Sequence, residues 1–320
     1  MKIGVFTVLF GQQPLERALD YIAQSGVQMV EFGTGGYPGN AHCDPDKLLG
    51  NASAQKEFLN AVESRGLSIS ALSCHGNPVH PDKAFAARDH ETFRKTVQLA
   101  KELGVDTVVT FSGCPGGSPD DKTPNWVTCA WPPDFTDTLK WQWEEVLVPY
   151  WKEQSKFLED NGVKVAFEMH PGFCVYNVDT MLKLRDAVGE NLGCNFDPSH
   201  LFWNGVDPVA AIRTLGDAIF HVHAKDCKVD KYNVAVNGCN DTKHYGDVLT
   251  RSWIFRTVGY GHGYQVWKDM ISTLKMIGYD SVLSIEHEDG LMSVNEGFQK
   301  AVSFLKEVMV TESAGEMWWA

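Results

Sequence analysis

The sequence predicts an α/β protein, a (β/α)8 TIM barrel, in a single domain of 320 residues. Short apolar runs alternate with helical patterns along the whole chain, eight times in all. The apolar runs are nearly continuous, which is typical of parallel strands covered by helices on both faces. A doubly wound sheet is the alternative, but it would normally carry a glycine-rich phosphate loop after its first strand, and residues 10–14 (FGQQP) contain none.

The first predicted strand lies in the N-terminal segment MKIGVFTVLF. This segment is superficially similar to a signal peptide. However, it has no small-residue cleavage site and an amphipathic helix follows it directly, so we expect a strand. The eight predicted strands are 2–9, 27–33, 67–74, 105–111, 163–169, 192–197, 217–225 and 281–287.

Helical periodicity fills the intervals between these runs. The predicted helices are 14–25, 53–65, 88–103, 144–160, 178–188, 207–214, 264–277 and 293–309. Ser53 and Asp207 stand where N-caps are needed, because their side chains can accept a hydrogen bond from a free backbone N–H. Glycines stand where helices should stop, at Gly66, Gly104, Gly162 and Gly278.

The barrel domain is predicted to span 1–310, followed by a tail at 311–320 that carries two adjacent tryptophans and suits a subunit contact. Two connections are unusually long. The one after strand four, 112–143, is rich in tryptophan, so we expect a folded lid or a subunit contact. The one after strand seven, 226–263, is polar, and Trp253, Ile254 and Phe255 should anchor it.

Composition excludes several classes of function. A formal net charge of -13 would repel a phosphate backbone, so nucleic acid is not an expected partner. No apolar stretch is long enough to span a membrane. The eight cysteines form no C-x-x-C pair, so we expect reduced thiols and a cytoplasmic location.

Four successive apolar runs end in metal-type ligands. These residues are Glu168, Asp197, His223 and Glu286. In a (β/α)8 barrel the active site lies at the C-terminal ends of the strands, and neighbouring strand ends are ~4.8 Å apart. Three carboxylates and one imidazole in such an arc favour one hard or borderline cation. We predict Mn²⁺, with Mg²⁺, Co²⁺ and Zn²⁺ as alternatives.

The same site predicts a reaction. A cation that polarises a sugar carbonyl acidifies the neighbouring C–H. A carboxylate can take that proton, and Glu168 and Glu286, on either side of the arc, are the predicted acid/base pair. His200, three residues after Asp197, and His75, at the end of strand three, are further catalytic candidates.

Four more residues are candidates for substrate binding. Lys225 and Asp226 follow His223 directly, although they could simply pair with each other. His170 follows the Glu168 strand end, and Trp131 belongs to the long tryptophan-rich connection. His221 shares a strand face with His223, so it should lie one layer deeper behind the ligands.

The strand-end segments resemble those of the xylose isomerase-like TIM barrels, described broadly as sugar phosphate isomerases/epimerases. The segments are Phe167-Glu168-x-His170, Asp197-Pro198-Ser199-His200, His221-x-His223-x-Lys225-Asp226 and Ile285-Glu286-His287-Glu288. The resemblance covers residues 1–310. It implies that Glu168 and Glu286 are metal ligands that double as acid and base, as in the ketose 3-epimerases, and that His200 contacts the substrate.

In the character of its long loops, the chain is also similar to the α subunits of bacterial C-glycoside deglycosidases. That resemblance implies a Mn²⁺-dependent lyase that cleaves 3-oxo-glycosides by elimination, with an oxidised glycoside as substrate. It also implies a small second subunit, and a homo-oligomer is the other arrangement that we expect. A ketose or sugar-phosphate isomerase/3-epimerase is the alternative function, and a DNA repair endonuclease of the same superfamily is a remote one.

Overall fold

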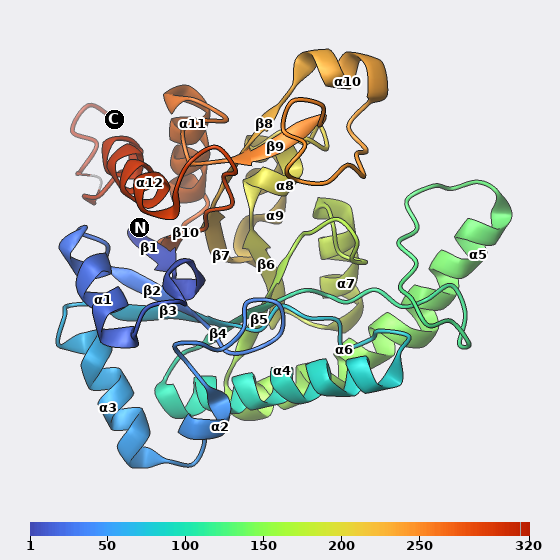
Figure 1. Cartoon of the computed structure of the whole chain (residues 1–320), viewed down its shortest axis with the longest axis horizontal. Helices are drawn as coiled ribbons and strands as arrows, with labels where there is room; N and C mark the ends of the chain where they lie inside the picture. Colours follow the sequence, from blue (N-terminus) through green and yellow to red (C-terminus); the bar gives the residue numbers. More distant parts are fainter. Residues whose placement is uncertain (314) are drawn as a thin grey trace.

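Eight parallel strands form a closed barrel surrounded by helices in the computed structural model, which describes residues 1–313 and 315–320 (Figure 1). The (β/α)8 prediction is confirmed. The barrel strands are β1 (Lys2–Phe6), β2 (Met29–Gly33), β3 (Ser68–Ser73), β4 (Thr107–Thr110), β5 (Lys164–Glu168), β6 (Leu192–Phe196), β7 (Ile219–Ala224) and β10 (Val282–Ile285). Each predicted strand contains one of them, and β1 closes the barrel by pairing with β10.

In the described chain, eight helices lie around the barrel between successive strands or after the last one (Figure 1). They are α1 (Leu15–Gln24), α3 (Ala52–Glu63), α4 (Lys83–Leu103), α6 (Val148–Asn161), α7 (Val178–Val188), α9 (Pro208–Leu215), α11 (Tyr264–Met276) and α12 (Val294–Val308). Further helical segments in the connections are η1 (Thr7–Phe10), α2 (Pro45–Leu48), α5 (Pro133–Trp141), η2 (Gln142–Leu147), α8 (Pro198–Phe202), η3 (Gly216–Ala218) and α10 (Lys231–Asn237). Strands and helices thus alternate as the sequence predicts.

Helix ends follow their caps. Asp207 caps α9 as predicted, since its side chain accepts a hydrogen bond from the Ala210 N–H at 2.8 Å. The Ser53 prediction is wrong, because Asn51 caps α3 through the Ala54 N–H. The helix predicted at 88–103 begins at Lys83, because Asp82 accepts hydrogen bonds from two free N–H groups there. Its predicted end is confirmed by Gly104, which follows it with φ of 71°.

The core between barrel and helices fixes the ends of the strands. Trp151 of α6 is fully buried and packs edge-on against Phe167 of β5, with ring centroids 4.5 Å apart. Its Nε1–H donates to the Ser112 carbonyl at 2.9 Å, where the long connection leaves β4. Truncating such a side chain to alanine typically costs about 3–5 kcal/mol. This contact therefore holds the residue before Glu168 against the outer layer.

The connection after β4, residues 112–143, is a folded arm. The Gln142 side chain donates to the carbonyls of Pro115, Gly116 and Asn125, which ties the two ends of the arm together. In the described chain α5 buries none of its side chains, and it projects away from the barrel (Figure 1). No described residue of the arm lines the central cavity, so the expectation of a lid is wrong for this conformation. A subunit contact stays a prediction.

The connection after β7 folds into a small antiparallel sheet of β8 (Asp226–Val229) and β9 (Trp253–Arg256), with α10 beyond it (Figure 1). Trp253 and Phe255 are buried, as predicted, whereas Ile254 is half-buried. Trp253 stacks on Trp203 with ring centroids 4.7 Å apart. This cluster holds the connection against α8, close to the strand ends.

The remaining predictions concern the N-terminal segment, the cysteines, membrane-spanning helices and the C-terminal tail. The N-terminal segment is a barrel strand, as predicted. Within the described chain all eight cysteines are free. No helix in that part combines the length and apolar character that a bilayer span requires. In the tail, every described residue is exposed, including Trp318 at 87%. Its role in a subunit contact stays a prediction.

Candidate functional site

Four side chains converge at the C-terminal ends of neighbouring barrel strands. They are Glu168 at the end of β5, Asp197 after β6, His223 in β7 and Glu286 after β10, and we call them the quartet. One ligand atom from each lies within 4.8 Å of the others. The structure therefore brings together the residues that the sequence predicts as metal ligands.

Local sequence explains how Asp197 presents one oxygen. Asp197 is the N-cap of α8, and its Oδ1 accepts the Ser199 N–H at 2.8 Å. The other oxygen, Oδ2, is left to face the quartet. The same helical turn carries His200, whose Nε2 lies 3.3 Å from Asp197 Oδ2 and 3.2 Å from Glu168 Oε1. The Asp-Pro-Ser-His segment thus places two potential metal ligands, Asp197 and His200, at one strand end.

The quartet fits a divalent cation. His223 Nδ1 lies 3.0 Å from an oxygen of Glu168 and 3.0 Å from an oxygen of Glu286. Donors at ~2.1 Å from one ion and at right angles are about 3.0 Å apart. Across the described residues, buried atoms without a hydrogen-bond partner include Asp197 Oδ2, His223 Nδ1 and Glu286 Oε2. These atoms face a common space, and none of them forms a hydrogen bond with another.

The negative charges of the quartet carboxylates also favour binding of a cation. Burial raises the pKa of Asp197, and the Glu168 and Glu286 charges add to this, so the value is about 6 despite His200 and Lys225. Burial would raise the pKa of Glu286, but Lys225 and His223 lower it to about 2. The pKa of Glu168 is also well below its usual range, because hydrogen bonds from imidazoles outweigh burial. Near neutral pH all three carboxylates are therefore largely ionised.

A cavity of about 450 Å³ opens above the quartet. Glu168 and Glu286 line it, whereas Asp197 and His223 are fully buried behind them. The polar part of the wall also contains His75, His170, Lys225 and Glu288. The apolar part contains Phe6, Val8, Tyr37, Pro38, Phe111 and Phe173. A bound molecule would therefore meet two of the four quartet members, with aromatic rings beside them.

The other predicted site residues lie as follows. His75 Nε2 lies 3.1 Å from Glu168 Oε2, in the cavity wall. His170 also lines the cavity, and burial together with His200 lowers its pKa to about 3, so its ring is neutral. Lys225 Nζ lies 3.2 Å from Glu286 and 2.6 Å from Glu288. All three side chains therefore surround the quartet.

Two predicted substrate contacts lie elsewhere. Asp226 is fully buried outside the cavity wall, and its carboxylate accepts the indole N–H of Trp267 and the backbone N–H groups of Gly259 and Gly261. It organises the connection after β7 instead of facing a ligand. Trp131 is 73% exposed on the arm and is not among the described residues that line the cavity. The arm projects outward, which carries Trp131 away from the site.

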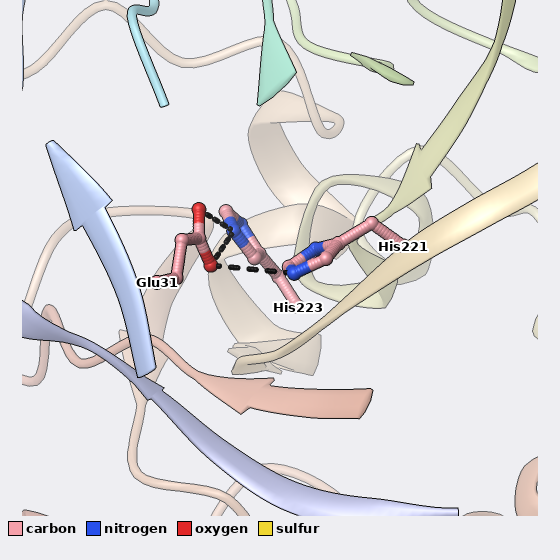
Figure 2. A group of neighbouring side chains, drawn as sticks. All are labelled: Glu31, His221 and His223. Carbon is pink, nitrogen blue, oxygen red and sulfur yellow. Dashed lines mark hydrogen bonds and ion pairs between the residues drawn. The ribbon is translucent and has the colours of Figure 1, made fainter. Parts of the chain in front are cut away.

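The layer beneath the quartet was only partly predicted. His221 is fully buried, and its Nδ1 lies 2.9 Å from Asn195 Oδ1, so it does lie deeper than His223. Asn195 in turn donates to Glu168 at 3.0 Å. Glu31 of β2 was missed, although its carboxylate contacts the His223 ring (Figure 2). The signal was present, because Glu31 is a charged residue inside an apolar strand.

Comparisons with known proteins agree with this architecture. The chain is 42% identical to an uncharacterized protein, YfiH, of Bacillus subtilis (strain 168), over 97% of this chain and 99% of that protein. It is 34% identical to the inosose dehydratase of Clostridium beijerinckii (strain ATCC 51743 / NCIMB 8052), over only 23% of this chain and 26% of that enzyme.

Similar solved structures include the IolI protein with a bound zinc atom, at a TM-score of 0.65 and 18% identity. The similarity covers 96% of this chain and 98% of that one, and it concerns the fold. The family model of the xylose isomerase-like TIM barrel matches residues 19–308. Because that match spans nearly the whole barrel, the chain belongs to the xylose isomerase-like TIM barrel family.

Proposed function

We propose that this protein is a divalent-metal-dependent carbohydrate enzyme. It takes a proton from the carbon next to a sugar carbonyl and eliminates the group on the following carbon. The substrate class that we favour is a 3-oxo-glycoside, which would release its aglycone. The observation that carries the proposal is that Glu168 and Glu286 alone in the quartet line the cavity, each 3.0 Å from His223 Nδ1 and at the ends of the two outer strands of the run β5-β6-β7-β10.

The quartet would hold the cation, which would polarise the 3-oxo group and so make the C2–H more acidic. Glu168 and Glu286 are ionised near neutral pH, and one of them accepts the C2 proton. The electron pair of the C2–H bond forms the C1–C2 double bond, and the bond from C1 to the aglycone breaks. Lys225 lines the same cavity, where its ammonium group can pair with the negative charge that develops on the aglycone, and the aglycone takes up its proton from the protonated glutamate or from water. Atoms and charges then balance without an oxidant.

The apolar wall supports a substrate with two unlike parts. Phe111 and Phe173 stack with ring centroids 4.1 Å apart, and Tyr37 lies 6.2 Å from Phe111. Aromatic faces of this kind bind sugar rings and aromatic groups by packing. The polar wall around Glu168 and Glu286 suits the oxidised sugar. A glycoside with an aromatic aglycone would use both surfaces of the cavity.

A ketose or sugar-phosphate isomerase/3-epimerase is the second candidate. The two carboxylates come from the ends of the two outer strands of the run β5-β6-β7-β10, so one could take a proton from one face of a sugar and the other could return it on the opposite face. The inosose dehydratase among the relatives is named for loss of water, which is an elimination and so favours the first candidate. An endonuclease is disfavoured by the net charge of -13 and by the acidic cavity.

The test uses full-length protein loaded with Mn²⁺. An aryl 3-oxo-glucoside and a set of ketoses would be incubated with it in deuterium oxide and followed by chromatography and NMR. Release of the aglycone is expected. Deuterium incorporation or inversion in a ketose, without cleavage, would instead support the epimerase. The absence of both reactions after loading with each candidate metal would contradict the proposal.

A further inference from the structure

We infer that Glu31 is a positioning residue of the metal centre. It fixes the orientation and the proton of the His223 imidazole, so that Nδ1 faces the other three members of the quartet. The inference rests on the proposed function only in that the quartet holds a divalent cation. Glu31 acts through His223, because it is fully buried beneath the quartet and is not among the described residues that line the cavity.

The contact between the two side chains assigns the proton. His223 Nε2 lies 3.0 Å from Glu31 Oε1 and 3.1 Å from Oε2, so it faces both oxygens at once (Figure 2). An ionised carboxylate can only accept, so Nε2 must carry the hydrogen. Nδ1 is then the nitrogen whose lone pair is available to a cation. A carboxylate behind a metal-binding imidazole fixes the ring and makes it a stronger donor.

Glu31 is itself held on both oxygens. The Ser73 hydroxyl of β3 donates to Oε1 at 2.5 Å, and the Ser284 hydroxyl of β10 donates to Oε2 at 2.6 Å. Ser284 is also the register partner of His223 in the neighbouring strand. The carboxylate plane is therefore fixed by strands on both sides of the barrel interior. Hydrogen bonds from these groups offset the cost of burying the charge.

The His223 imidazole is held by a contact on its ring face as well as by Glu31 at its edge. The Phe6 ring of β1 stacks on His223 with centroids 5.8 Å apart and an angle of 28° between the planes. His221 also approaches Glu31, with its Nε2 at 3.6 Å from Oε2, which is too far for a hydrogen bond (Figure 2). The Glu31 contact with His223 is thus the short one, and the ring has one orientation that satisfies it.

Glu31→Gln tests the inference because it keeps the shape of the side chain and removes its charge. Binding of Co²⁺ would be measured by competition with a chelator, and the visible spectrum of the bound ion would report the ligand geometry. We expect Co²⁺ binding about tenfold to hundredfold weaker, with an altered spectrum. Asp241→Asn is the matched control, because Asp241 is a buried carboxylate in the connection after β7, and it should leave both readouts unchanged.

Ser284→Ala is the second variant, in case Glu31→Gln does not fold. It frees one oxygen of Glu31 and should weaken Co²⁺ binding in the same direction, by a smaller factor. Wild-type affinity and spectrum in a folded Glu31→Gln, or in Ser284→Ala if that is the variant that folds, would overturn the inference. So would two ions per wild-type chain with the second lost in Glu31→Gln, since Glu31 would then be a ligand.

The same measurements separate this inference from the proposed reaction. Weakened Co²⁺ binding in Glu31→Gln, together with no turnover of 3-oxo-glycosides by wild type, would support the positioning role and reject the reaction. Normal turnover with unchanged Co²⁺ binding in the variant would reject only the positioning role. A wild-type protein that binds no divalent ion would overturn both.

Discussion

The ammonium nitrogen of Lys225 lies 3.2 Å from Oε1 of Glu286, and both groups line the cavity. Burial alone would lower the pKa of Lys225, but the Glu286 charge, with those of nearby carboxylates, raises it well above its usual value. Lys225 is therefore a buried cation that offsets part of the charge of the quartet. It does this without supplying a ligand, because an ammonium group has no lone pair for a metal.

Lys225→Met should destabilise the metal-free protein by about 3–5 kcal/mol, because buried carboxylates would lose their partner. A divalent ion should restore more stability to the variant than to wild type, since it replaces the missing positive charge. Urea unfolding with and without Mn²⁺ measures both effects. Lys95→Met removes two ion pairs with the exposed carboxylates of Asp46 and Glu91, and it should change stability by no more than about 1 kcal/mol. Equal stability of the Lys225 variant and wild type without metal would contradict the prediction.

Glu168→Gln and Glu286→Gln should each reduce turnover by about 10³-fold or more, because an amide cannot accept a proton as a general base. The fold should remain, since glutamine has nearly the same shape. Turnover of an aryl 3-oxo-glucoside would be measured beside the metal content of each variant. An exposed-site change, Glu190→Gln, is the control and should retain full activity. Substantial turnover by either cavity variant would remove that residue from the acid/base pair.

Much of this site was visible in the sequence because strand ends in a barrel share one rim. The eightfold alternation of elements predicted that rim, and the four strand-end ligands then had to meet. His221 and His223 are two residues apart on one strand, so they share a face and lie in successive layers. These inferences need only local periodicity and the symmetry of the barrel.

The remaining features depend on contacts between distant segments. The partners of Glu31 lie 42, 192 and 253 residues away, in β3, β7 and β10. Nothing near Glu31 in the sequence identifies them. Asp226 was predicted as a substrate contact because it follows Lys225, although adjacent residues in extended chain point to opposite sides, and the structure places it outside the described cavity wall. The place of Trp131 outside the described cavity wall was not predictable, because composition does not determine the direction in which a long connection leaves the barrel, and its contact with a substrate stays a prediction.

Binding of a divalent ion should weaken as the pH falls through the neutral range, and more steeply below about 6, where Asp197 takes up a proton as well as His223. In the metal-free protein the pKa of Asp197 is about 6, raised mainly by burial, so the carboxylate takes up a proton below that value. The pKa of His223 is also raised, since neighbouring carboxylates outweigh burial. Protons therefore compete with the cation, and affinity should fall about tenfold or more per pH unit on the acid side.

Cobalt titrations at intervals between pH 5 and pH 8 would measure this competition. The Asp197→Asn variant should bind Co²⁺ more weakly. In its plot of affinity against pH, the number of protons that compete with the ion on the acid side should fall by one. An affinity that does not change with pH in the wild-type protein would contradict the assignment of these groups as ligands.

Asp226→Asn should lower stability and leave the chemistry intact. The Asp226 carboxylate accepts hydrogen bonds from the Cys227, Gly259 and Gly261 N–H groups, the backbone and ring of His262, and the Trp267 indole. An amide would place an NH2 group against some of these donors. The expected loss is about 3 kcal/mol.

Urea unfolding would measure that loss. Steady-state kinetics at low temperature, where the variant stays folded, would measure its KM. The KM should stay near the wild-type value, because Asp226 lies outside the described cavity wall. Asp230→Asn, at the half-buried N-cap of α10, is the matched control and should cost less than about 1 kcal/mol, since asparagine caps a helix nearly as well. A large rise in KM with unchanged stability would instead restore Asp226 as a substrate contact. The two outcomes differ because a residue that anchors a connection acts on the folded state, whereas one that binds a ligand acts on the complex.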